Sequence, residues 1–100
     1  MQAAQRRVFS AAARRLAEDA RNEAASYPMD SDEWQFYAGV ERAAQDALNV
    51  DVQLLRGEHP EWLRHQPAAF REGYLKASAL FAAAMTSPEP PLRLPLPAMG

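Results

Sequence analysis

Apolar side chains recur at three- and four-residue steps over three long stretches of the chain, and this spacing constrains the fold more than any other feature. Positions with this spacing share one face of an α-helix, whereas a half-buried strand alternates at every second residue. One short apolar run, Val50 to Leu55, is compatible with a strand. No second run in the chain offers a partner, so we expect a helical extension or a packed loop there. The sequence therefore predicts an all-α protein.

The composition supports the same fold class and narrows the chemistry. Alanine, the best helix former, supplies 21 of the 100 residues. A hydrophobic share of 48% in a chain of this length suits one small domain. The absence of cysteine excludes disulfides and thiolate metal sites and fits a reducing compartment. Arginine far outnumbers lysine, and this bias together with the alanine content indicates GC-rich coding, so we expect a bacterial or phage source.

Local start and stop signals place the first two helices. The first is expected from about Gln2 to Ser26 and ends before Pro28, because the residue before a proline leaves the α region. Asp30 is predicted to be the N-cap of the second helix, with Glu33 three residues later completing a capping box. This helix should end near Asn49.

Prolines organise the rest of the chain. Pro60 is expected to begin a short helical turn over Glu61 to His65, and Pro67 to begin the last helix, which ends at Ser87. Residues 88–100 include five prolines, which exclude helix and central strand. We predict a small bundle of three main helices plus one short helical turn in residues 1–87, with an extended proline-rich tail in residues 88–100.

The second and last helices share a short internal pattern, an aromatic residue one turn before a glycine and an alanine one turn after it. The two copies are Phe36-x-x-Gly39-x-x-x-Ala43 and Phe70-x-x-Gly73-x-x-x-Ala77. A glycine inside a helix costs about 0.5–1 kcal/mol relative to alanine. Close approach of two helix backbones would explain both glycines, and we predict that these two helices cross there. The alternative is coincidence in an alanine-rich chain.

Histidines and carboxylates cluster around Pro60: Glu58, His59, Glu61 and His65. Two imidazoles and two carboxylates are zinc ligands in other proteins, but the spacing matches no helical pair of ligands. Capping and surface charge at a turn explain them better. No nucleophile signature and no glycine-rich phosphate loop are present in the sequence. We expect no metal, no cofactor and no enzymatic activity.

Three arginines lie seven residues apart on the first predicted helix, Arg7, Arg14 and Arg21. A basic stripe of this kind can follow nucleic-acid phosphates. Glu18 and Asp19 interrupt it, and the formal net charge is −2. A solvated face with internal ion pairs is therefore the favoured interpretation.

The tail offers two patterns for partner binding. Pro88-x-x-Pro91-x-Arg93 resembles the ligands of SH3-type grooves. If the tail is extended, Leu92, Leu94 and Leu96 share one face, and Pro95 and Pro97 block only one edge from pairing with a partner strand. Alternatively, the leucines fold back over the chain's own helices or the tail is a linker. Trp34 and Trp62 at helix starts belong either to the core or to a binding patch.

We therefore predict a cytoplasmic, non-enzymatic protein–protein interaction module, such as an accessory protein, inhibitor or assembly factor, that binds a protein partner or itself. Arg6-Arg7-Val8-Phe9 resembles a twin-arginine export signal, but Arg14 and Arg15 interrupt the apolar region that such a signal needs. Two alternatives remain. A nucleic-acid-associated regulator would use the first-helix arginines, and a small enzyme or ligand-binding protein would use the Glu58–His65 region beside a pocket.

Overall fold

The computed structural model describes residues 3–49, 60–86 and 93–97, with side chains for residues 7–49, 60–84 and 93–97. Its elements are the helices α1 (Ala3–Ala24), α2 (Asp32–Leu48) and α4 (Ala68–Thr86), together with the short 3₁₀ helix η1 (Glu61–His65). The described residues contain no strand. The predicted all-α bundle of three main helices plus one helical turn is thus confirmed, whereas the run Val50 to Leu55 lies outside the described residues.

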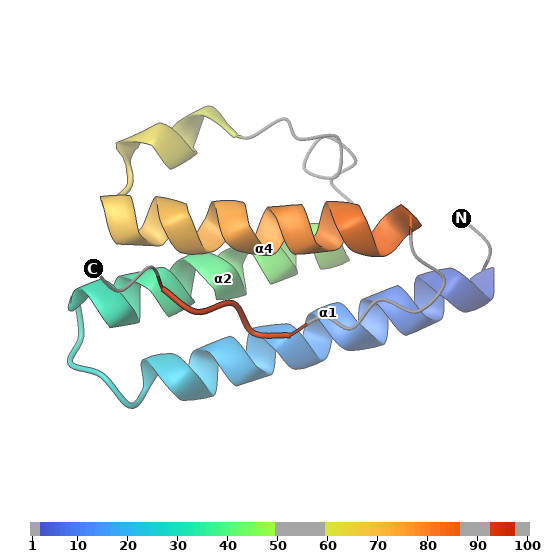
Figure 1. Cartoon of the computed structure of the whole chain (residues 1–100), viewed down its shortest axis with the longest axis horizontal. Helices are drawn as coiled ribbons and strands as arrows, with labels where there is room; N and C mark the ends of the chain where they lie inside the picture. The colour runs from blue at the N-terminus through green and yellow to red at the C-terminus, as the bar shows by residue number, and fades with distance from the viewer. Residues whose placement is uncertain (1–2, 50–59, 87–92, 98–100) are drawn as a thin grey trace.

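Figure 1 shows how the three helices are oriented relative to one another. Helix α1 runs against the direction of α2, while α2 and α4 run in the same direction side by side. Contacts join α2 closely to both other helices, whereas α1 touches α4 only slightly. The ring of Phe9 on α1 nevertheless reaches Phe81 on α4, with an edge-to-face centroid distance of 5.7 Å.

Each helix buries the apolar face that its spacing predicts. Alanines provide much of this interior, which lets the backbones lie close together, and aromatic rings fill the remaining space. The largest fully buried side chains are Leu16, Phe36, Tyr37, Val40, Tyr74 and Phe81.

The N-cap of α2 corrects one sequence prediction. Asp30 is not the cap: it adopts a left-handed backbone conformation with φ 67°, and its carboxylate accepts a hydrogen bond from Gln35 Nε2 at 3.2 Å. Ser31 is the cap, and its hydroxyl oxygen accepts the backbone N–H of Trp34 at 3.3 Å. Asp32 and Glu33 then fall in the first turn, where the helix dipole favours negative charge.

The glycine pattern marks the crossing of α2 and α4, as predicted. A β-carbon on Gly39 would overlap the carbonyl oxygen of Phe70 and lie 3.0 Å from the backbone nitrogen of Tyr74. A β-carbon on Gly73 would overlap the carbonyl oxygen of Phe36. Each glycine therefore meets the aromatic residue that precedes the other glycine by one turn, so the crossing has approximate twofold symmetry. Ala43 and Ala77 are fully buried beside it.

The start of α4 and the short helix before it also match the sequence prediction. Pro60 precedes η1 with φ −61°, and Leu63 of η1 is buried. The backbone N–H of Arg71 donates to the carbonyl of Pro67 at 3.0 Å, so Pro67 begins the α4 ladder without needing an N–H of its own.

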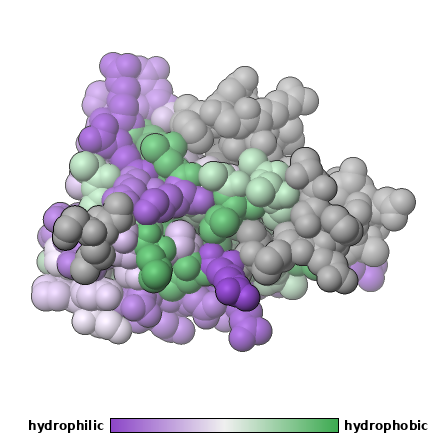
Figure 2. All heavy atoms as spheres, viewed as in Figure 1, coloured by the Kyte–Doolittle hydropathy of each residue, from purple (hydrophilic) through white to green (hydrophobic). Residues whose placement is uncertain are grey.

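Residues 93–97 lie on the bundle rather than away from it (Figure 1). Leu94 is half-buried and packs against the core, and Lys76 Nζ donates to the carbonyl oxygen of Leu96 at 2.9 Å. Figure 2 shows hydrophobic atoms gathered in the middle of this face. The tail segment therefore adds one side chain, that of Leu94, to the outer part of the core.

Candidate interaction surface

An open depression of about 430 Å³ lies between η1 and the first half of α4. It is lined by Pro60, Glu61, Leu63, Arg64, Arg71 and Leu75. The depression thus belongs to the region that the sequence singled out around Pro60, with α4 supplying its second wall.

Trp62 fixes η1 in place and so shapes the depression. Its ring meets the rings of Phe70 and Tyr74 edge-on, at centroid distances of 6.3 Å and 5.6 Å. The guanidinium carbon of Arg42, on α2, lies 4.7 Å from the centroid of the Trp62 ring, which is within the range of a cation–π contact. The indole therefore binds both parallel helices, and Trp62 is half-buried support rather than an exposed anchor.

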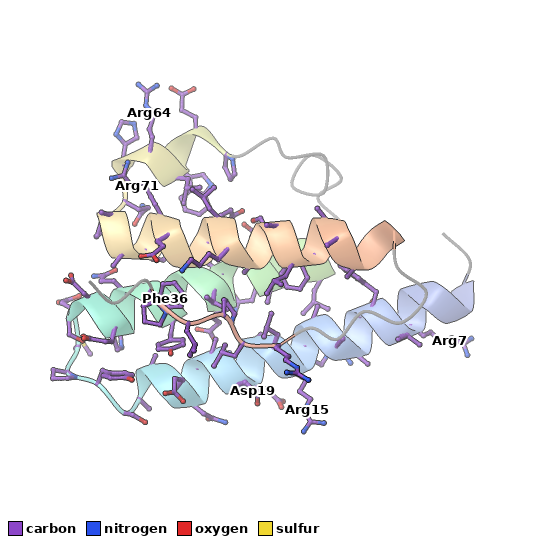
Figure 3. All side chains as sticks on the ribbon, in the orientation of Figure 1. Arg7, Arg15, Asp19, Phe36, Arg64 and Arg71 are labelled. Atoms are coloured by element: carbon purple, nitrogen blue, oxygen red, sulfur yellow. The ribbon has the colours of Figure 1, made fainter. Side chains whose placement is uncertain are left out.

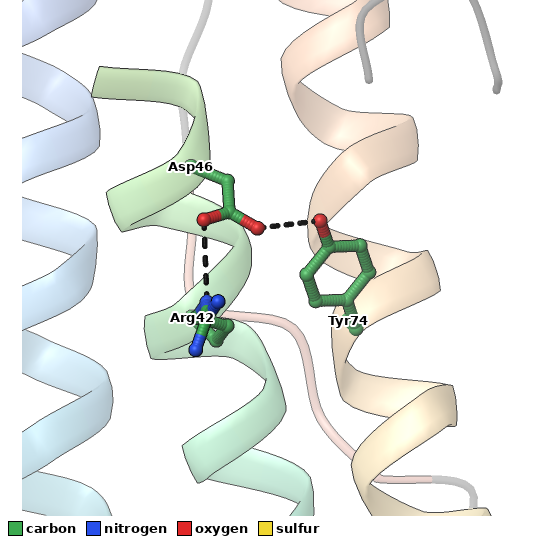
Figure 4. A network of polar contacts seen from close by, with 3 residues as sticks. All are labelled: Arg42, Asp46 and Tyr74. Carbon is green, nitrogen blue, oxygen red and sulfur yellow. Dashed lines mark hydrogen bonds and ion pairs between the residues drawn. The ribbon is translucent and has the colours of Figure 1, made fainter. Parts of the chain in front are cut away.

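Two of the residues that contact this indole, Arg42 and Tyr74, belong to a polar network with Asp46 (Figure 4). The hydroxyl of Tyr74 donates to one carboxylate oxygen of Asp46 at 2.7 Å, and Nε of Arg42 donates to the other at 3.2 Å. Asp46 thereby holds the guanidinium that stacks on Trp62. The fully buried Tyr74 ring joins this network to the core, so the position of η1 depends on both apolar and charged contacts.

The apolar part of the depression comes from residues of different exposure. Leu63 is only 4% exposed and belongs to the core. Leu75, on α4, is 41% exposed and is a large apolar side chain that the depression presents to solvent.

Charge on the rim of the depression is mainly positive. Arg64 and Arg71 come from η1 and α4 and lie at the same end of the molecule (Figure 3). Among the described lining residues Glu61 is the only one with a carboxylate, and its ion pair with Arg64, at 3.3 Å, is highly exposed on both sides. Among the described residues, no carboxylate forms an ion pair with Arg71. The rim therefore has spare capacity for an anionic group.

The tail residues proposed to bind a partner occupy different environments. Leu94 packs on the chain's own core, whereas Leu96 is 72% exposed and Arg93 is exposed. The packing of Leu94 agrees, for that residue, with the alternative that the leucines fold back over the chain's own helices. Leu92 and the Pro88–Pro91 part of the proline pattern lie outside the described residues. Trp34 is half-buried and packs on the core beside the α2 N-terminus.

The first-helix arginines are all exposed, and Figure 3 shows Arg7 pointing away from the bundle. They are not equally available for phosphates. Nε of Arg21 lies 2.6 Å from a carboxylate oxygen of Glu41 on α2, so this arginine already has an anionic partner. The stripe of exposed arginines thus consists of Arg7, Arg14 and the Arg21–Glu41 ion pair.

The histidine–carboxylate cluster is described only in part. His65 and Glu61 are exposed on η1, whereas Glu58 and His59 lie outside the described residues. In the described ranges, no three histidine or carboxylate side chains are grouped closely enough to hold a metal ion. No helix in these ranges is long and apolar enough to cross a membrane.

Sequence reasoning found Trp62, Leu63 and Glu61 but missed Arg71 and Leu75 as members of the same surface. These two residues are four apart on α4 and share a face, a signal that was available. What the spacing did not reveal is that η1 folds onto that face. Comparison with known proteins adds nothing to this assignment, since no protein-family model, curated protein or solved structure matches the chain.

Proposed function

We propose that the protein is a non-enzymatic protein–protein interaction module and that the depression between η1 and α4 is its contact surface. The observation that carries this proposal is the exposed Leu75 beside a concavity whose rim carries Arg64 and Arg71. Arginine is enriched in protein–protein interfaces, and an apolar centre with a polar rim is their usual arrangement.

The rigidity of the surroundings supports the same function. Trp62 is held between the Arg42 guanidinium and the rings of Phe70 and Tyr74, so η1 is fixed before any partner arrives. A preorganised surface loses little conformational entropy on binding. The absence of cysteine fits action in a reducing compartment, and we propose the cytoplasm of a bacterial cell.

Affinity purification from the source organism with tagged wild type and a Leu75→Ser variant tests the function. Val8→Ser on α1 is a matched control, because Val8 is also a large exposed apolar residue, at 58%, on another element. We expect a partner that is enriched by wild type and Val8→Ser and lost with Leu75→Ser. Titration calorimetry with the purified partner should reproduce this order. Loss with Val8→Ser alone, or no enriched protein, would contradict the proposal.

A further inference from the structure

The two arginines and the two leucines of the depression form one continuous surface with mixed chemistry. Leu75 provides the exposed apolar contact, Leu63 adds only the small part of its side chain that the core leaves accessible, and Arg64 and Arg71 lie on the η1 and α4 sides. A guanidinium offers paired N–H donors that match a carboxylate, and such charge-assisted pairs are directional. The surface therefore selects a ligand that combines an apolar side chain with nearby carboxylates.

The described residues that line the depression have a charge balance opposite to that of the whole chain. The formal net charge of the protein is −2, yet these lining residues include two arginines and one glutamate. Glu72 on the neighbouring face of α4 is paired with Lys76 at 2.9 Å, so its charge is locally compensated. A local cationic rim on an acidic protein favours an anionic partner and suppresses association with basic ones.

We propose that the depression binds an extended acidic segment of a partner protein, with a leucine-sized side chain against the exposed Leu75 and carboxylates paired with Arg64 and Arg71. This inference rests on the proposed function and specifies the partner's chemistry. Glu61 competes with the partner's carboxylates for Arg64, because a carboxylate oxygen of Glu61 lies 3.3 Å from a guanidinium nitrogen of Arg64. Removing that carboxylate is therefore expected to strengthen binding.

The test uses NMR titration of the ¹⁵N-labelled full chain with a capped synthetic peptide that has one leucine flanked on each side by an aspartate and a glutamate. The titration extends to about 1 mM, which covers weak contacts. We expect shifts centred on the amides of Leu63, Arg64, Arg71 and Leu75. Peptides with asparagine and glutamine in place of the acids, or with serine in place of leucine, should bind at least fivefold more weakly.

Charge variants of the protein locate the carboxylate contacts. Arg64→Glu and Arg71→Glu should each weaken the acidic peptide about tenfold, because attraction becomes repulsion, and added salt should reduce the difference. Glu61→Gln should bind about two- to threefold more tightly, since it frees Arg64. Arg14→Glu is the matched control: it makes the same charge change at an exposed residue of α1 and should leave the affinity within about twofold.

Several outcomes would overturn this assignment. They are equal binding of the neutral and acidic peptides, an unchanged affinity in both Arg64→Glu and Arg71→Glu, or binding of a DNA duplex but of no peptide. A neutral peptide with a free C-terminus shows whether a chain end, rather than acidic side chains, supplies the carboxylate. If the acidic peptide fails while Leu75→Ser still loses a purified partner, the interaction function stands and only the acidic specificity is wrong.

Discussion

Gly39 of α2 lies directly against the carbonyl oxygen of Phe70 on α4, so the two backbones meet without any side chain between them. The same contact recurs between Gly73 and Phe36. Two mid-helix glycines, each unfavourable for its own helix, thus set the distance between the parallel helices. The aromatic rings and the indole that define the η1 surface pack around this crossing.

Substitution of either glycine by alanine tests the crossing. In an exposed helix, Gly→Ala stabilises by about 0.5–1 kcal/mol. Here the new methyl group would overlap a carbonyl oxygen, so α2 and α4 must separate, and we expect a loss of about 1–3 kcal/mol for Gly39→Ala and for Gly73→Ala. Urea unfolding followed by circular dichroism measures both. Because each variant widens the same interface, the double variant should lose less than the sum.

Ala79→Gly is the matched control for this experiment, since Ala79 is an exposed residue of α4. It should lose only about 0.5–1 kcal/mol, the intrinsic cost of glycine. A gain in stability for both Gly39→Ala and Gly73→Ala would show that the backbones are not in contact.

The hydrogen bond from Tyr74 to Asp46 should couple these residues energetically. Hydrogen bonds to charged groups contribute about 1.5–3 kcal/mol, and the partial exposure of Asp46 lowers this value, so we expect Tyr74→Phe to lose about 1–2 kcal/mol. A double-mutant cycle with Asp46→Asn should give a coupling energy of about 1 kcal/mol. Strict additivity of the two substitutions would rule out the interaction.

The two tail leucines should respond differently to substitution. Full burial of a leucine contributes about 1.5–3 kcal/mol, and Leu94 is half-buried, so Leu94→Ser should lose about 1 kcal/mol. It should also expose residues 93–97 to limited proteolysis. Leu96→Ser is the control, because a surface substitution usually stays within about 0.5 kcal/mol. Equal effects in both variants would mean that the tail does not pack as described.

Stability should fall in alkali partly through Tyr37. Burial, followed by the nearby charge of Glu23 and the phenol of Tyr27, raises the pKa of Tyr37 above its usual value of 10.0. The folded state therefore keeps the phenol proton that the unfolded chain releases. This contribution is present below the unfolded pKa and is lost as the pH rises through the folded pKa. Chemical unfolding at a series of pH values should show a shallower decline above about pH 10 for Tyr37→Phe. An identical slope would contradict this.

The helix positions were predictable because they depend on the local periodicity of apolar residues. The glycine crossing was predictable because a glycine inside a helix is unfavourable and so indicates a packing reason. The first helix, expected over residues 2–26, spans Ala3–Ala24, and the last begins next to Pro67 as predicted. The cap of α2 was misassigned because Asp30 and Ser31 are both residue types that cap helices. The structure distinguishes them by the backbone angle of Asp30 and by the hydrogen bond that the Ser31 hydroxyl accepts from the backbone N–H of Trp34. The depression could not be predicted, because it depends on the packing of η1 on α4, and no residue spacing in the sequence specifies that packing.

The parallel course of α2 and α4 explains why such a surface exists. An antiparallel hairpin needs only a short loop, whereas parallel neighbours force the chain to travel back the length of a helix, about 25 Å for the 17 residues of α2. Helix η1 directly precedes α4 in the sequence and lies beside its first half. The shared direction of α2 and α4 thus has a consequence at the surface, because it brings η1 beside the first half of α4, where the two elements form the walls of the depression.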